Sequence, residues 1–131
     1  MEPSELRTMI ADYMENGFLE NIIDMFKHDE SLYAFVGDLL RDERFRVRIG
    51  ITALVETLAA EDPNSVSRAL PSLLPLLKDQ NPMLRGDVAH LLGVIGQRDS
   101  LPFLREAAHN EDPVVRTIAQ EAIEEIESKR S

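Results

Sequence analysis

Histidine, carboxylate and hydroxyl side chains are the groups in this chain that could do chemistry, and their spacing decides which chemistry. The histidines are His28, His90 and His109, and no two of them are three or four residues apart. A zinc site on one helix needs such a pair, so the sequence predicts no metal ligands. His90 follows Asp87 by three residues, a spacing that allows metal binding or acid–base work but more often gives a solvated surface pair. No Ser/His/Asp order and no glycine-rich phosphate loop stands out, so we predict no catalytic residue and no cofactor.

Three arginines hold equivalent places and are the other candidates for chemistry. Arg48, Arg85 and Arg116 each follow a short polar turn. A planar guanidinium with five N–H donors can bridge several acceptors, so we expect these arginines to bond acidic or carbonyl groups of the turns. The polar side chains available as acceptors are Asp42, Asp79, Asn110 and Asp112. An anion site is the alternative interpretation, but a repeated residue implies a repeated structural need, so we predict a structural arginine ladder.

The elements that carry these arginines are copies of one template. Residues 70–85 match residues 101–116 without a gap, and residues 39–58 follow the same pattern. Self-similarity at a period of this length indicates a repeat architecture. Apolar residues recur at helical spacing, and no period-two alternation persists. The sequence therefore predicts an all-α fold of about eight helices in four stacked pairs, with no sheet.

The expected helices follow from apolar stripes and their start and stop signals. We expect them to begin at about residues 3, 18, 31, 46, 71, 82, 100 and 113. Gly17 and Gly96 are expected to end two of them, and Asp112 to cap the last. Ser31 is expected to cap the third, and the two prolines at 71 and 75 to bend the fifth or to start it. The polar segment 60–65 is expected to be a connection.

Composition and charge limit the class of protein. The chain has 131 residues, 24 acidic and 14 basic side chains, and a net charge of −10. Affinity for nucleic acid comes mainly from basic residues that release counterions, so we predict no nucleic-acid partner. The chain has no cysteine, no apolar signal core at its N-terminus and no apolar run near the ~20 residues that span a bilayer. We therefore expect a cytoplasmic protein without disulfides or membrane contact.

Segments 79–85 and 110–116, together with 88–96, resemble the HEAT-repeat family, and more narrowly its short prokaryotic, phycobilin-lyase HEAT-like members. The resemblance implies a right-handed α-solenoid, an alpha-alpha superhelix, whose second helices line a concave face that usually holds protein partners. It also implies one domain over residues 1–131. Within this domain we expect an N-terminal helical cap pair at 1–30 and HEAT-like repeats at 31–60, 64–97 and 99–129.

Two kinds of enzyme share this repeat, and the chain lacks the functional residues of both. Deoxyhypusine hydroxylases carry His-Glu iron ligands near the start of second helices, where this chain has Gly86-Asp87 and Thr117-Ile118. HEAT-like DNA glycosylases use a basic, aromatic-lined face, which this chain does not have. We therefore predict a non-enzymatic protein-interaction or scaffold module. A lyase- or hydroxylase-like subunit that holds a cofactor or chromophore in the groove is the alternative.

The predicted binding surface consists of non-core positions of the second helices, spaced by three and four residues so that they share a helix face. The predicted partner-binding residues are Arg46, Met83, Asp87, His90, Val94, Ile118, Glu121 and Glu125. Gly50, Ala53, Thr57 and Val114 complete the three sets. Because the surface is apolar near the turns and acidic farther along, we predict a protein partner with a basic and apolar segment. The methionine-rich N-terminal helices are the second candidate surface.

Overall fold

The computed structural model describes residues 1–129, which form helices joined by short turns, with no strand among them. The chain divides into two compact units, the first ending at Ala69 and the second beginning at Leu70. The first unit contains α1 (Pro3–Glu15), α2 (Leu19–His28), η1 (Glu30–Phe35), α3 (Val36–Leu40), α4 (Phe45–Glu61), α5 (Pro63–Val66) and η2 (Ser67–Ala69), where η denotes a 3-10 helix. The second contains α6 (Leu70–Leu73), η3 (Leu74–Lys78), α7 (Pro82–Ile95), η4 (Arg98–Ser100), α8 (Leu101–Ala107) and α9 (Pro113–Ser128). The predicted all-α fold is confirmed for these residues.

Glycine and aspartate end and start helices at the predicted places. Gly96 is the C-cap of α7, with φ of +78°, and Gly17 follows α1 with φ of +86°. This left-handed conformation strains any residue that carries a Cβ. At the start of α9 the Asp112 carboxylate accepts from the N–H groups of Val114 and Val115 at 2.9 and 3.2 Å. The cap therefore satisfies two of the donors that a helix leaves unpaired at its N-terminus.

The third helical stretch is capped by Asp29, not by Ser31 as predicted. Asp29 Oδ1 accepts from the Ser31 N–H at 3.1 Å and from the Ser31 hydroxyl at 2.6 Å, so Ser31 lies inside the first turn of η1. Aspartate and serine are equally good caps. The negative charge of aspartate is also favourable at the positive end of a helix, and the helix begins one residue before the predicted cap.

The junction between α4 and α5 also differs from the prediction. Residues 60–65 do not form an extended connection, because α4 continues to Glu61, α5 begins at Pro63, and Asp62 alone lies between them. The Asp62 carbonyl accepts from the N–H groups three and four residues later, at 3.1 and 3.2 Å. Proline suits the first turn of a helix, where no N–H is needed. One residue therefore ends α4 and starts α5.

The two prolines of the fifth helical stretch fall where the helix type changes. Pro71 lies in the first turn of α6 and Pro75 in the first turn of η3. A proline inside a helix removes one hydrogen bond and clashes with the preceding turn. The chain stays helical past both prolines by starting a new segment at each of them.

Three turns, one before each of α4, α7 and α9, share one hydrogen-bond pattern. The side-chain oxygens of Asp42, Asp79 and Asn110 each accept from the backbone N–H two residues later, at 2.8, 3.0 and 2.9 Å. Such a bond lets aspartate or asparagine close a tight turn by itself. The repeated polar residue of the template therefore shapes the turn.

The arginines of the template bond backbone carbonyls of the same turns. Arg48, Arg85 and Arg116 each donate through Nη1 to the carbonyl six residues earlier, at 3.4, 2.7 and 2.9 Å. The expected side-chain acceptors Asp42, Asp79, Asn110 and Asp112 each accept from a backbone N–H group of their own turn or helix start. Asn110 also accepts from Arg85 Nη2, at 3.4 Å. The carbonyl six residues back is thus the acceptor that all three arginines have in common.

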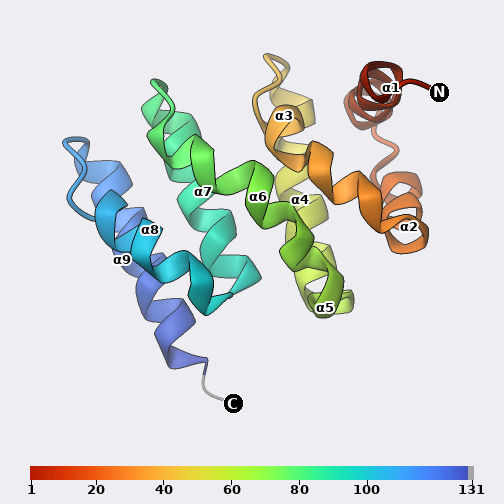
Figure 1. Ribbon diagram of the computed structural model, residues 1–131. Helices are drawn as coiled ribbons and strands as arrows, with labels where there is room; N and C mark the ends of the chain where they lie inside the picture. The colour runs from red at the N-terminus through yellow and green to blue at the C-terminus, as the bar shows by residue number, and fades with distance from the viewer. Residues whose placement is uncertain (130–131) are drawn as a thin grey trace. The chain divides into compact units, whose positions relative to one another are not determined.

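In the second unit, α7 and α9 lie side by side (Figure 1). A Cβ placed on Gly93 would lie 2.9 Å from Ala122 Cβ and 3.0 Å from Ala122 Cα, and one placed on Gly86 would lie 3.1 Å from Ile118 Cδ1. These distances are shorter than ordinary carbon contacts. The two glycines are therefore what allows the helices to pack so closely.

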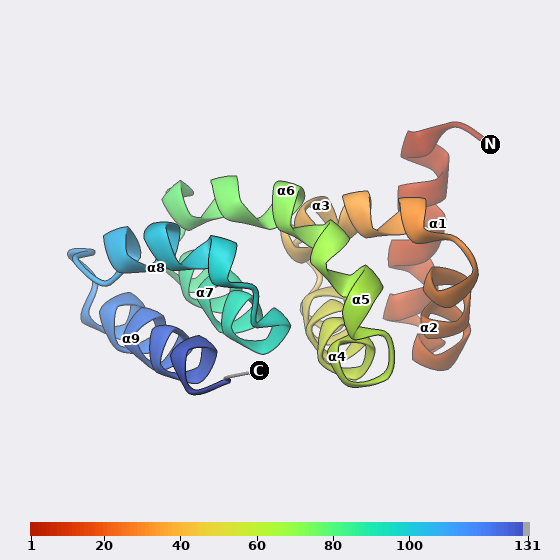
Figure 2. The same cartoon turned by 60° about the horizontal axis from the view of Figure 1, so that its bottom comes forward.

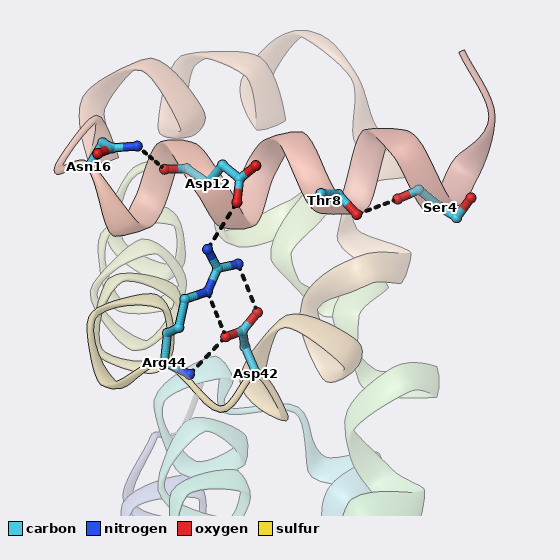
Figure 3. A network of polar contacts seen from close by, with 6 residues as sticks. All are labelled: Ser4, Thr8, Asp12, Asn16, Asp42 and Arg44. Carbon is cyan, nitrogen blue, oxygen red and sulfur yellow. Dashed lines mark hydrogen bonds and ion pairs between the residues drawn. The ribbon is translucent and has the colours of Figure 1, made fainter.

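In the first unit, α1 and α2 both contact α4. Arg44 links α1 to the turn before α4: it donates to Asp12 at 2.9 Å and to the two carboxylate oxygens of Asp42 at 3.1 and 3.2 Å (Figure 3). These bonds favour the ionised carboxylate and hold the pKa of Asp42 below its usual range. Beside this network, Met14 of α1 lies against Gly50 of α4.

Candidate functional site

The exposed sides of α7 and α9 form the candidate site in the second unit. The two helices are adjacent in both cartoon views (Figures 1 and 2). Met83 and Val114 lie at the starts of these helices, at equivalent positions of the template, and are 66% and 63% exposed. Large apolar side chains that gather at the surface mark interaction sites. The turn-proximal end of the site is therefore apolar.

Farther along the two helices the site becomes acidic. Glu121 and Glu125 of α9 are exposed, Asp87 of α7 is half-buried and His90 is exposed. Asp87 and His90 each have an interaction partner. Within residues 1–129 no three histidine, aspartate or glutamate side chains are placed to hold one metal ion. Charged and apolar contacts are thus what this surface offers.

One basic residue at the acidic end was not predicted. Lys129 Nζ lies 3.6 Å from a Glu125 carboxylate oxygen and 3.5 Å from the Val94 carbonyl oxygen. Lys129 follows Glu125 by four residues, which is the helical spacing of an ion pair and was the available signal in the sequence. The lysine neutralises part of the acidic end.

Two of the predicted partner-binding residues are only partly exposed to solvent. Ile118 is half-buried, and its Cδ1 approaches the backbone of Gly86, so its side chain contributes to the packing of α9 on α7. Val94 is half-buried as well. Both residues border the exposed apolar and acidic positions and contribute less surface to a partner than Met83 or Val114.

In the first unit, the predicted residue Arg46 is exposed on α4. Its neighbours Phe45 and Ile49 are each 56% exposed, although neither was predicted as a site residue. Gly50, predicted on the same face as Arg46, is instead covered by α1, because a Cβ there would meet Met14 Sδ at 2.7 Å. The exposed large apolar residues of α4 therefore lie at the start of the helix.

A family model that describes HEAT repeats matches residues 34–124, more than half of the chain. The chain belongs to the HEAT-repeat family. HEAT repeats generally mediate protein–protein interactions, which fits an exposed surface of apolar and charged side chains. In this HEAT-repeat chain, α7 and α9 are the second helices of the two repeats that share the gapless template.

The comparisons support the family and nothing narrower. No curated protein sequence matches the chain. The likeness to the phycobilin-lyase members therefore stays a prediction. Among residues 1–129 of this HEAT-repeat chain, no helix is both long and apolar enough to cross a membrane.

Proposed function

We propose that this HEAT-repeat chain is a non-enzymatic scaffold that binds a protein partner along its second helices. The observation that carries the proposal is the pair of exposed apolar side chains at the starts of α7 and α9, Met83 and Val114, followed on α9 by the exposed acids Glu121 and Glu125. Apolar contacts supply affinity, while charged groups at the rim supply specificity and on-rate. A partner segment with both apolar and basic residues complements this surface.

The repeat boundaries 31–60, 64–97 and 99–129, with a cap pair at 1–30, are part of the same proposal. In that arrangement α4 carries contacts in the first unit, and α7 and α9 carry contacts in the second. Arg46, Asp87, His90, Val94 and Ile118 are the remaining proposed contacts. Arg46 would face an acidic residue of the partner, since like charges placed opposite each other weaken binding.

The test is a charge reversal on this surface. The partner is captured from the native host on the wild-type chain, and its affinity is then measured for the variant Asp87→Lys with Glu121→Lys. We expect affinity to fall at least tenfold, because two attractive interactions become repulsive. Binding to the wild type should also weaken as salt rises above ~0.15 M, where the screening length is about 8 Å.

A matched control carries the same change in net charge elsewhere. Glu43 and Glu111 are exposed and lie in turns, so Glu43→Lys with Glu111→Lys alters the total charge without touching the proposed surface. The control variant should bind like the wild type. If the partner binds the Asp87/Glu121 variant normally and resists high salt, this surface is not the site, and α1 and α2 become the next candidate.

A further inference from the structure

A hollow of about 400 Å³ lies in the second unit, away from the exposed sides of α7 and α9. Its apolar wall comes from η3 and α8 and includes Leu77, Phe103 and Ala107. Its polar wall includes Arg85, the residue that α7 contributes. Ligand sites are commonly hollows of this size, mostly apolar, with a few polar groups that fix orientation.

Two residues that line the hollow differ from their counterparts in the preceding repeat. When residues 101–116 are aligned with residues 70–85, Ala107 corresponds to Leu76 and Phe103 corresponds to Ser72. The smaller side chain leaves space beside η3, and the aromatic ring, 44% exposed, forms a wall at that space. The hollow therefore combines a small residue, Ala107, with an aromatic residue, Phe103.

Arg85 brings a guanidinium to the wall of the hollow. Its Nη1 donates to the carbonyls of Asp79 and Gln80 at 2.7 and 3.3 Å, and its Nη2 donates to Asn110 at 3.4 Å. Its Nε–H is buried and has no hydrogen-bond partner among residues 1–129. A buried donor without an acceptor is unfavourable. A guanidinium binds a carboxylate through charge-assisted hydrogen bonds. Arg85 lines the hollow, and its Nη2 bond to Asn110 is long, at 3.4 Å.

The charges around the hollow favour an anion. Lys78 and His109 line it together with Arg85, and the opposing carboxylate, Glu106, is paired with Lys78 at 3.3 Å. This is a local excess of basic groups in a chain whose net charge is −10. A ligand that has an anionic group and an apolar part would complement both the basic and the apolar side chains of the hollow.

We propose that this hollow binds a carboxylate joined to an apolar or aromatic group. The carboxylate accepts from Arg85, and the apolar body lies between Phe103 and Leu77. The source is either a free organic acid or the C-terminal carboxylate of a polypeptide that ends in an apolar residue. This site is independent of the proposed scaffold function, since its wall does not include the exposed residues Met83 and Val114.

The first experiment titrates the full chain with 3-phenylpropanoate and, separately, with the neutral alcohol 3-phenylpropanol, followed by amide and arginine Nε–H signals in NMR. We expect the acid to shift signals of residues 74–78, 103–110 and Arg85. The alcohol should bind at least about tenfold more weakly, because it lacks the charge-assisted bonds. Equal binding of acid and alcohol, or shifts confined to other residues, would overturn the proposal.

Variants locate the site. Ala107→Leu restores the template residue and should abolish binding by filling the hollow, whereas the matched control Ala108→Leu, one residue away and outside the lining, should retain it. Glu106→Gln should tighten binding severalfold by removing the opposing charge. Phe103→Ser removes the aromatic wall and should weaken binding. Because Phe103 is exposed, this variant provides a test if Ala107→Leu does not fold. Wild-type affinity in Phe103→Ser and Ala107→Leu contradicts the proposal.

A peptide that ends in a free phenylalanine carboxylate, compared with its C-terminal amide, separates the two sources. Binding of the peptide acid alone identifies a polypeptide terminus, while binding of 3-phenylpropanoate alone identifies a small organic acid. If neither carboxylate binds, the proposal is wrong. The scaffold proposal is tested by other residues, Asp87 and Glu121, so each proposal can fail separately.

Discussion

The two units hold their helices together by different chemistry. In the second unit, α7 and α9 approach through glycine, with the backbone at Gly93 pressed against Ala122. In the first unit, α1 is joined to α4 by Arg44, which bonds carboxylates from two places in the chain. Close backbone packing depends on side-chain size, whereas an ion network depends on pH and salt.

This difference is one of side-chain size against side-chain charge. The contact of α7 with α9 depends on Gly86 and Gly93 of α7, which meet Ile118 and Ala122 of α9. Helix α1 lies outside the family match that begins at residue 34, and its contact with α4 is made by individual side chains. The second unit has ion pairs as well, such as Arg105 with Glu127 at 3.3 Å, but these side chains are about half exposed and contribute little.

Glycine replacement should separate the two units most clearly. Gly93→Ala places a Cβ 2.9–3.0 Å from Ala122, where the contacting atoms are Cα and Cβ and cannot move without moving α9. We expect a loss of about 3 kcal/mol in the free energy of unfolding, the upper part of the range for overpacking. Urea denaturation followed by circular dichroism measures it.

The matched control is Gly50→Ala in the first unit. Its Cβ would meet Met14 Sδ at 2.7 Å, near the end of a flexible side chain that can rotate away. Alanine is also favoured over glycine in a helix by about 1 kcal/mol, so the net change should be about 1 kcal/mol or less. If both replacements destabilise equally, the contrast between backbone packing and side-chain packing is wrong.

The sequence was most informative where the template repeats. Asp112 before Pro113, and Gly96 after the apolar stripe of α7, are start and stop signals with a direct physical cause, so the ends of these helices could be predicted. The junction at Asp62 could not, because the segment around it is polar and resembles a connection, while the proline at its end also suits a helix start.

In the candidate site, too, some features could be predicted from the sequence and others could not. Exposure of Met83 and Val114 follows from helical register alone. Met14 of α1 covers Gly50 of α4. This contact could not be predicted, because α1 does not follow the repeated template. The acceptors of the arginines could not be identified either, because a backbone carbonyl has no signature in the sequence.

Arginine replacement should give the next largest effect. Arg85→Ala removes the 2.7 Å bond to the Asp79 carbonyl, two weaker bonds and the packing of the side-chain stem. We expect a loss of roughly 1–3 kcal/mol. The equivalent Arg48 donates over a longer distance, 3.4 Å, and lies 5.9 Å from the centre of the Phe45 ring, so Arg48→Ala should cost less, about 1 kcal/mol.

Thermal melts of both arginine variants test the structural role of these residues. Lower melting temperatures, with the larger decrease for Arg85→Ala, are expected. An unchanged melting temperature for Arg85→Ala would refute the structural role of the arginine ladder. A larger decrease for Arg48→Ala would contradict the order that the hydrogen-bond distances imply.

Acid should weaken the first unit through Asp42, the smallest of the three effects. Hydrogen bonds from Arg44 lower the pKa of Asp42 in the folded state. The stabilisation is therefore complete above the unfolded-state pKa, about 3.9, and is lost as pH falls through the lower folded-state value. Asp42→Asn keeps an acceptor for the turn N–H but cannot ionise, so it should be less stable than the wild type at pH 7, with the difference shrinking towards pH 3.

The equivalent residue of the second unit is the control for this pH effect. The Asp79 side chain accepts from the N–H of Asn81 at 3.0 Å, while Arg85 donates to the backbone carbonyl of Asp79. Asp79→Asn should therefore change the pH dependence less than Asp42→Asn when urea midpoints are compared at pH 7 and pH 3. A stability difference between wild type and Asp42→Asn that is the same at both pH values would show that the charge of Asp42 does not stabilise the network. The contact of α1 with α4 would then rest on apolar packing such as Met14 against Gly50, as it does between helices of the second unit.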